Sequence, residues 1–332
     1  MRGSALRQAL EGATGPLPAR EAAHVGLGVR REVEQVMRLY GKTPTQHLHD
    51  LGILNLLHVV VVNARMVPIR DGQTPDHRHA IAVGHGKHAA RHIDAYLKAT
   101  DEIYVTDAYH SLSIEGYRVS SKLIERVRSG NWNPDGDEAD RQQRDAMAAR
   151  GYWQAYQAVR NSLERALGGE NAGTIAEQGH GAWYREMFAP SVAAGILRPA
   201  DLAGYRNDQV YIRGSKHVPP SREAVRDMLP ALFDLLKEEA EASVRVVLGH
   251  FVFVYIHPYM DGNGRMGRFL MNLMLASGGY PWTVVPVEQR DDYMAALEEA
   301  SVQQSIVPLT DFIASLVEAG LKGQMTAQPP SP

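Results

Sequence analysis

The stretch that decides the fold is His257-Pro258-Tyr259-Met260-Asp261-Gly262-Asn263-Gly264-Arg265-Met266-Gly267-Arg268. Two glycines flank Asn263, so the backbone there can adopt positive φ and turn its N–H groups into a concave anion-binding nest. Apolar residues then recur at helical spacing, which predicts a helix beginning near Arg265. A helix N-terminus attracts phosphate through its dipole and its unpaired N–H donors. The sequence therefore predicts a phosphate-binding loop at the start of a helix.

The side chains around this loop are of the types that phosphate chemistry uses. Arg265 and Arg268 project from nearly the same side of the predicted helix, and their guanidinium groups suit phosphate oxygens. Asp261 supplies a carboxylate oxygen, and Mg²⁺ bound with a polyphosphate typically needs only one or two such ligands. The imidazole of His257, with an ordinary pKa of about 6.5, can accept a proton near neutrality. Together these groups predict attack by a hydroxyl on a phosphate.

The composition narrows the class of protein. The chain has 332 residues, of which 44% are hydrophobic and 22% are charged, as in an ordinary globular protein. Lys and Arg number 35 against 38 Asp and Glu, so the basic excess typical of nucleic-acid-binding proteins is missing. The absence of cysteine excludes disulfides, thiolate catalysis and Cys-ligated zinc, and fits a reducing compartment. With no visible secretory signal or membrane span, we expect a soluble cytoplasmic protein without nucleic-acid or membrane partners.

Periodicity predicts a mainly α-helical fold with a mostly helical N-terminal region. Helices are expected at residues 87–98, 120–128, 140–167, 182–194, 223–236 and 241–256. The β-branched run at residues 59–62 fits either a strand or a buried helix. Val210, Tyr211 and Ile212 precede a turn and predict one strand of a small β-hairpin. The expected division of the chain is a region of unknown role at 1–100, two helices at 101–173, a catalytic core at 174–320 and a disordered tail at 321–332.

Residues 257–268 resemble the signature of the Fic (Fido-domain) family, His-Pro-Phe-x-Asp/Glu-Gly-Asn-Gly-Arg-x-x-Arg. Every defined position matches except that Tyr259 replaces Phe, which keeps a buried aromatic ring. The resemblance runs from about Ile103 to Leu316. It implies a Fic/Fido helical core with a β-hairpin flap, and an enzyme that transfers AMP from ATP, with Mg²⁺, to a Ser, Thr or Tyr hydroxyl. The target would be another protein or the enzyme itself.

The resemblance also implies roles for individual residues. His257 would be the catalytic base and Asp261 the Mg²⁺ ligand. The nucleotide would be held by Asp261, Gly262, Asn263, Gly264, Arg265, Met266, Gly267 and Arg268. Gly264, where the phosphotransferring Doc-like branch has Lys, resembles the AMP-transferring members. Val210, Tyr211 and Ile212 would form the flap that aligns the target by strand addition. Tyr293 would face the adenine, with a place in the core as its alternative.

A second motif, Ser111-Leu112-Ser113-Ile114-Glu115-Gly116, resembles the family's inhibitory sequence. Its position ahead of the core is the class II arrangement, which has the inhibitor in the same chain. The resemblance implies that Glu115, supported by Ser111 and Gly116, pairs with Arg268 and competes with the γ-phosphate. Removal of AMP, transfer of another nucleotide and a Fic-like interaction or regulatory protein stay open as alternatives. The target protein and a homo-oligomeric state are also left open.

Overall fold

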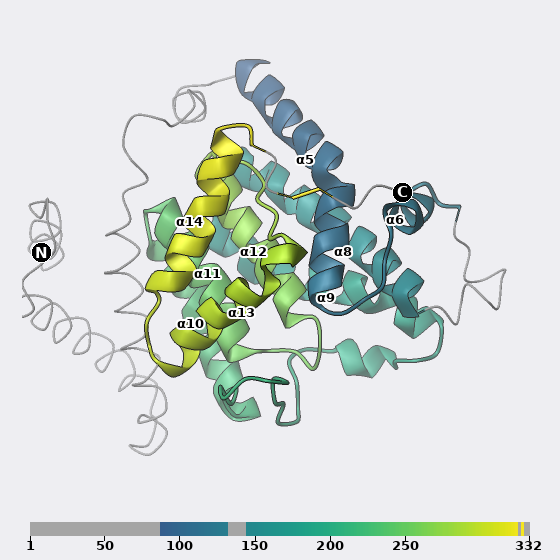
Figure 1. Cartoon of the computed structure of the whole chain (residues 1–332), viewed down its shortest axis with the longest axis vertical. Coiled ribbons are helices and arrows are strands. Elements are labelled where there is room, and N and C mark those ends of the chain that lie inside the picture. Colours follow the sequence, from purple (N-terminus) through teal and green to yellow (C-terminus); the bar gives the residue numbers. More distant parts are fainter. Residues whose placement is uncertain (1–86, 132–143, 325–326, 329–332) are drawn as a thin grey trace, which may run out of the picture. The chain divides into compact units, whose positions relative to one another are not determined.

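A computed structural model of the chain describes residues 87–131, 144–324 and 327–328 (Figure 1). All of them fall in the compact unit Ile69–Pro332. The expectations for residues 1–86, including the β-branched run at 59–62, lie outside the described residues, as do residues 140–143 and half of the predicted tail. Within the described ranges, no helix combines the length and the apolar character that crossing a membrane requires.

The described part of the chain is built from helices, which confirms the mainly helical class. In chain order they are α5 (Lys87–Ile114), α6 (Ser121–Arg128), α8 (Arg144–Leu167), α9 (Ala172–Ala193), the 3₁₀ turn η1 (Pro199–Leu202), α10 (Arg222–Glu238), α11 (Ala242–Ile256), α12 (Asn263–Ser277), the 3₁₀ turn η2 (Val287–Gln289), α13 (Arg290–Val302) and α14 (Val307–Leu321).

Polar caps and close packing set the helix boundaries. The Ser221 side chain accepts a hydrogen bond from the amide of Ala224 and begins α10 as predicted. Helix α9 begins ten residues earlier than its predicted start at 182, because Asn171 caps it. Its interior Gly173 lies so close to the backbone of α10 that a Cβ there would be 2.5 Å from the amide nitrogen of Lys237. Tertiary packing therefore overrides the low helix propensity of glycine at this position.

Helix α12 is the centre of the core. Apart from Gly264 and the terminal Ser277, all of its residues are buried. It packs against α11, α8, α9 and α5 (Figure 1). A helix that is buried on every face must be covered on every side, so its first turn is held by several other elements. One of these is α5, which passes without a break through residue 100, the predicted boundary of the N-terminal region.

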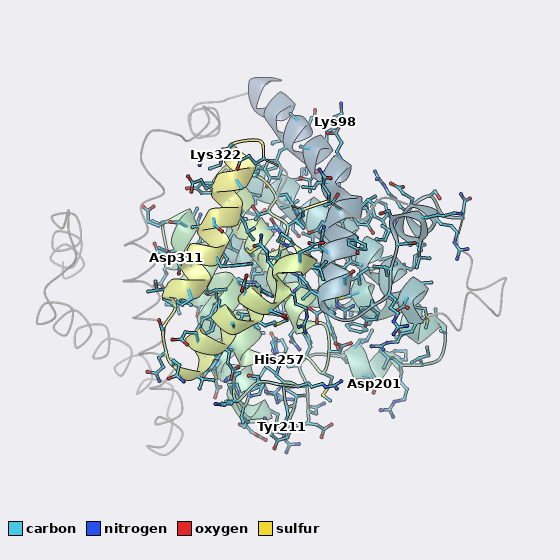
Figure 2. All side chains as sticks on the ribbon, viewed as in Figure 1. Lys98, Asp201, Tyr211, His257, Asp311 and Lys322 are labelled. Carbon is cyan, nitrogen blue, oxygen red and sulfur yellow. The ribbon has the colours of Figure 1, made fainter. Side chains whose placement is uncertain are left out.

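The prediction of β-strands near residues 210–212 is wrong. The segment 204–220, here called the flap, contains no strand. Between residues 207 and 220 its one backbone-to-backbone hydrogen bond is from Ser215 to Ile212, at 3.1 Å. Pro219 and Pro220 have no N–H, so the returning segment cannot complete a ladder. Side chains hold the flap instead. Figure 2 labels Tyr211, which is 76% exposed on the flap, and His257, at the end of α11.

Candidate active site

His257 ends α11 in the left-handed conformation, with φ 53° and ψ 60°. The helix stops there because Pro258 disfavours a helical conformation in the residue before it. Nδ1 of His257 donates to the carbonyl oxygen of Val254 at 3.1 Å, which leaves the lone pair of Nε2 free. Burial lowers the pKa of His257, so the ring is neutral near pH 7. Nε2 can therefore accept a proton.

The loop after His257 is closed by one buried side chain. The Oδ1 atom of Asn263 accepts from the amide of Tyr259 at 2.9 Å, and its Nδ2 atom donates to the Tyr259 carbonyl at 2.8 Å. The Tyr259 ring is buried, as predicted, and stacks on Tyr184 with 3.7 Å between ring centroids. The Asn263 side chain therefore shapes the turn and does not project from it.

The start of α12 carries a set of unpaired amides. Gly262, at φ 80°, precedes the helix, and its N–H donates to Oδ1 of Asp261 at 2.6 Å. The first helical hydrogen bond runs from Met266 to Gly262, at 2.9 Å. Three intervening N–H groups donate to no group in the described part of the chain: those of Asn263, Gly264 and Arg265. Unpaired donors at a helix N-terminus form an anion-binding site.

Gly262 is required by both its conformation and its surroundings, and this can be tested. A Cβ at this position would lie 2.9 Å from the Phe188 ring and 3.2 Å from the Met187 sulfur. Gly262→Ala is expected to lower the free energy of unfolding by about 2–4 kcal/mol, from backbone strain plus overpacking. Gly116→Ala is the matched control, because Gly116 has φ 84° and no atom within 4 Å of the added methyl. Denaturant unfolding should show a smaller loss for the control; equal losses would contradict close packing of the loop against α9.

Arg265 is a buried cation with few partners. Its side chain is 2% exposed and lies between two rings, 5.2 Å from the Tyr117 centroid and 5.3 Å from that of Phe188. One nitrogen is 3.4 Å from Oδ2 of Asp261, and the buried Nε has no hydrogen-bond partner. Asp261 and Arg265 both line a cavity of about 900 Å³. An anion in this cavity could therefore reach Arg265.

The Asp261 carboxylate in this cavity is the group that could bind a metal ion. The Asp261 side chain is 62% exposed, so its carboxylate is accessible. Within the described ranges no three His, Asp or Glu side chains form a group that could hold a metal by themselves. The donor set thus fits Mg²⁺ only where phosphate oxygens complete its coordination, which is how Mg²⁺ commonly binds with nucleotides.

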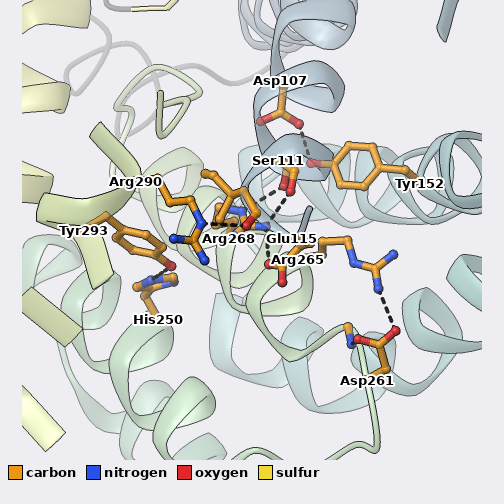
Figure 3. Close-up of polar contacts among 12 residues, drawn as sticks. Asp107, Ser111, Glu115, Tyr152, His250, Asp261, Arg265, Arg268, Arg290 and Tyr293 are labelled. Atoms are coloured by element: carbon orange, nitrogen blue, oxygen red, sulfur yellow. Dashed lines mark hydrogen bonds and ion pairs between the residues drawn. The ribbon is translucent and has the colours of Figure 1, made fainter. Parts of the chain in front are cut away.

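Arg268 lies deeper and is held by the end of α5 (Figure 3). Its Nε donates to Oγ of Ser111 at 2.8 Å, and its Nη2 donates to the Ser111 carbonyl at 2.9 Å and to Oε1 of Glu115 at 2.8 Å. The remaining nitrogen, Nη1, is buried without a partner. The same Glu115 oxygen lies over the Cα of Gly264, where a Cβ would overlap it. The predicted contact between Glu115 and Arg268 is therefore present, and it covers part of the anion-binding nest.

Both members of this pair are ionised at neutral pH. Burial by itself would lower the pKa of Arg268, but the charge and hydrogen bond of Glu115, together with the nearby Tyr293 and Tyr152, outweigh it and raise that pKa above its usual value. Burial by itself would raise the pKa of Glu115, whereas Arg268 and Arg265 bring it below its usual value. An anion that approaches Arg268 must therefore displace a carboxylate.

Three residues predicted to bind nucleotide lie in the packing between helices. Tyr293 is buried, and its hydroxyl is 2.8 Å from Nε2 of His250 (Figure 3). The structure thus places Tyr293 in the core, the alternative left open by its spacing. Met266 is also buried, and a Cβ on Gly267 would lie 2.7 Å from the Val254 side chain of α11. These positions fix how α12 and α13 pack on α11.

Arg206 precedes the predicted flap strand, and sequence reasoning assigned it no role of its own. It is buried, its Nε donates to the carbonyl of His257 at 2.8 Å, and its backbone N–H donates to the Pro258 carbonyl at 2.9 Å. The same guanidinium donates to the carbonyls of Asp208 and Pro220. Arg206 therefore ties the flap to the loop that carries His257. Its sequence neighbourhood holds no signal for this, because all but one of these partners are distant in the chain.

The region that carries this site resembles known proteins. Residues 180–275 match the model of the Fic/DOC family. The chain is 29% identical over 257 residues to protein adenylyltransferase Fic of Drosophila virilis, covering 75% of this chain and 49% of that protein. It is 32% identical over 132 residues to protein adenylyltransferase fic-1 of Caenorhabditis elegans, covering 39% of this chain and 25% of that protein. The chain thus spans less than half the length of these relatives.

Solved structures show a related fold. Fic-1 (residues 134–508) from C. elegans superposes with a TM-score of 0.55 at 20% identity, over 96% of this chain and 95% of that one. A Fic family protein from Desulfovibrio desulfuricans G20 gives a TM-score of 0.53 at 20% identity, over 74% and 73% of the two chains. The helical arrangement around the motif is therefore a shared one.

Proposed function

Because this chain carries a domain of the Fic/DOC family, we propose that it is a protein adenylyltransferase, which transfers AMP from ATP to a Ser, Thr or Tyr hydroxyl. One observation carries this proposal. The free Nε2 of the neutral His257 belongs to the same short loop as the unpaired amides at the start of α12. A base and an anion-binding nest in one loop are what hydroxyl attack on a phosphate requires.

The reaction follows from these positions. The amides of residues 263–265 hold the α- and β-phosphates, Arg265 neutralises the β-phosphate and Arg268 receives the γ-phosphate. The hydroxyl oxygen of the target forms a bond to the α-phosphorus, and the bond between that phosphorus and the bridging oxygen to the β-phosphate breaks. Pyrophosphate leaves with the bonding electron pair, while Nε2 of His257 takes the hydroxyl proton. Mg²⁺ held by Asp261 would neutralise phosphate charge.

The flap is the element best suited to hold the target. The backbone N–H groups of Val210, Tyr211 and Ile212 make no hydrogen bond within the described residues. An extended target segment could pair with them by strand addition, and the flap would then gain the strand character that it lacks alone. Arg206 fixes the distance between this segment and the His257 loop.

Autoinhibition belongs to the same proposal. Glu115 is bound to the Arg268 guanidinium, which the γ-phosphate would otherwise contact. The Glu115 carboxylate also lies over Gly264. ATP that cannot seat its γ-phosphate would have its α-phosphate out of line for attack. The ion pair thus supports a class II arrangement, with the inhibitor supplied by the turn that follows α5.

Mass spectrometry tests the reaction class. The full chain carrying Glu115→Gly is incubated with Mg²⁺ and, separately, each of the four nucleoside triphosphates. We expect the protein to gain an AMP group with ATP and to gain far less from the other nucleotides. Absence of any covalent nucleotide on the enzyme and on added protein extract would contradict the proposed function. Release of AMP from the modified protein when the wild-type chain is added would instead support hydrolytic removal of AMP.

A further inference from the structure

The last turns of α5 carry polar side chains that extend the inhibitory motif toward the N-terminus. Asp107 and Ser111 are four residues apart and so lie on the same side of α5, and Glu115 follows in the turn directly after the helix. Ser111 and Glu115 both contact Arg268. Asp107 lies one turn further back, is 4% exposed, and accepts a hydrogen bond from the Tyr152 hydroxyl of α8 at 2.6 Å (Figure 3).

The hydroxyl of Tyr152 can donate to only one partner. Tyr152 has a single hydroxyl proton, and it is donated to Asp107. Toward Ser111, Tyr152 can then act only as an acceptor. Burial raises the pKa of Tyr152 and Asp107 raises it further, whereas a hydrogen bond from Ser111 acts in the opposite direction. Toward Arg268, the Ser111 hydroxyl acts as an acceptor from Nε. Ser111 therefore links α5 to Arg268, while one turn earlier on the same helix Asp107 accepts the hydroxyl proton of Tyr152.

We propose that Tyr152 and Asp107 are positioning residues that hold Arg268 ready for the γ-phosphate of ATP once Glu115 has moved away, an inference that rests on the proposed function. Arg268 makes its contact with Glu115 through Nη2, whereas its contact with the Ser111 hydroxyl uses Nε. Departure of Glu115 therefore leaves the bonds between Arg268 and Ser111 in place. The guanidinium keeps its orientation, and Nη1 together with one N–H of Nη2 becomes available to phosphate.

The charge of Asp107 fits this role. Once Glu115 has moved away, Arg268 is a buried cation that has lost its nearest counter-charge, which is an unfavourable state. The Asp107 carboxylate acts on Arg268 by its charge. Burial raises the pKa of Asp107 to about 6, so the group is still mostly ionised at pH 7. A buried carboxylate is costly unless it is paired, and the charge of Arg268 offsets part of that cost.

The test compares nucleotides that differ by the γ-phosphate alone. The reference protein is the full chain carrying Glu115→Gly, and calorimetry measures its affinity for ATP and for ADP. Adding Tyr152→Phe is expected to weaken ATP binding about fivefold, the effect of losing one hydrogen bond, and to leave ADP binding unchanged. Asp107→Asn, which keeps an acceptor and removes the charge, should give an intermediate loss. A purely structural role would weaken both nucleotides alike.

Helix α8 supplies a matched control. Tyr156 lies one turn beyond Tyr152, is also fully buried, and donates to Asp101 of α5 at 2.9 Å. Tyr156→Phe removes a similar bond between the same two helices away from Arg268, and should leave the ratio of ATP to ADP affinity unchanged. Equal effects of the two tyrosine substitutions on that ratio, no effect of Tyr152→Phe, or tighter ATP binding by Asp107→Asn would overturn the inference. A reference protein that binds ATP but transfers no AMP would refute the proposed function, while the affinity ratio would still report on Arg268.

Discussion

Replacing Glu115 with glycine is expected to raise the rate of AMP transfer roughly 10- to 150-fold. The carboxylate is 2.8 Å from a guanidinium whose side chain is only 4% exposed, and a γ-phosphate must displace it. Hydrogen bonds to charged groups contribute about 1.5–3 kcal/mol, and each 1.4 kcal/mol is a factor of ten. Initial rates with labelled ATP, on the protein itself and on added target, measure the change.

Two further measurements make this prediction specific. Glu115→Gln keeps the length of the side chain and removes its charge, so it should give a smaller activation than glycine. Because Arg268 then lacks its ionised partner, the activated variants should unfold at lower denaturant concentration than the wild type. An unchanged rate in the glycine variant would show that Glu115 does not inhibit. Activation together with increased stability would mean that the gain comes from somewhere other than the lost ion pair.

Replacing His257 with alanine in the Glu115→Gly protein is expected to lower the rate of transfer by about 10²- to 10⁴-fold, the usual contribution of a general base. Affinity for ATP should change little, because the nest is made of backbone amides and arginines from residues 263–268. Single-turnover rates and calorimetry separate the two effects. A variant that kept most of its rate would remove His257 as the base.

The backbone conformation of His257 calls for a second variant as a control. His257 holds a left-handed conformation, and alanine tolerates it no better. His257→Asn is the matched variant, because asparagine accepts this conformation more readily and cannot serve as a base at neutral pH. Equal losses of rate in the alanine and asparagine variants would assign the effect to the imidazole. Recovery of activity with asparagine would assign it to the backbone.

The chemistry of the loop could be predicted from the sequence because it is local. The residues from Asp261 to Arg265 are consecutive, so their backbone geometry and the helix that follows are properties of one short segment. The resemblance to a known motif added the pairing of Glu115 with Arg268, which lie 153 residues apart. No periodicity could have indicated that contact. The four-residue spacing of Asp107 and Ser111 puts them on one face of α5, but spacing does not show which residue of another helix meets that face.

By itself, then, the sequence determined the helical class, and it predicted where the phosphate-binding loop lies and which groups are proposed to carry the chemistry. Tertiary structure decided what those groups do together. It placed Tyr293 in the core, left the flap without strands and brought Arg206 to the His257 carbonyl. The physical reason is range: propensity, capping and a helix N-terminus act over a few neighbouring residues. Burial of a charge and hydrogen bonds between distant residues depend on side chains that only the packed fold brings together.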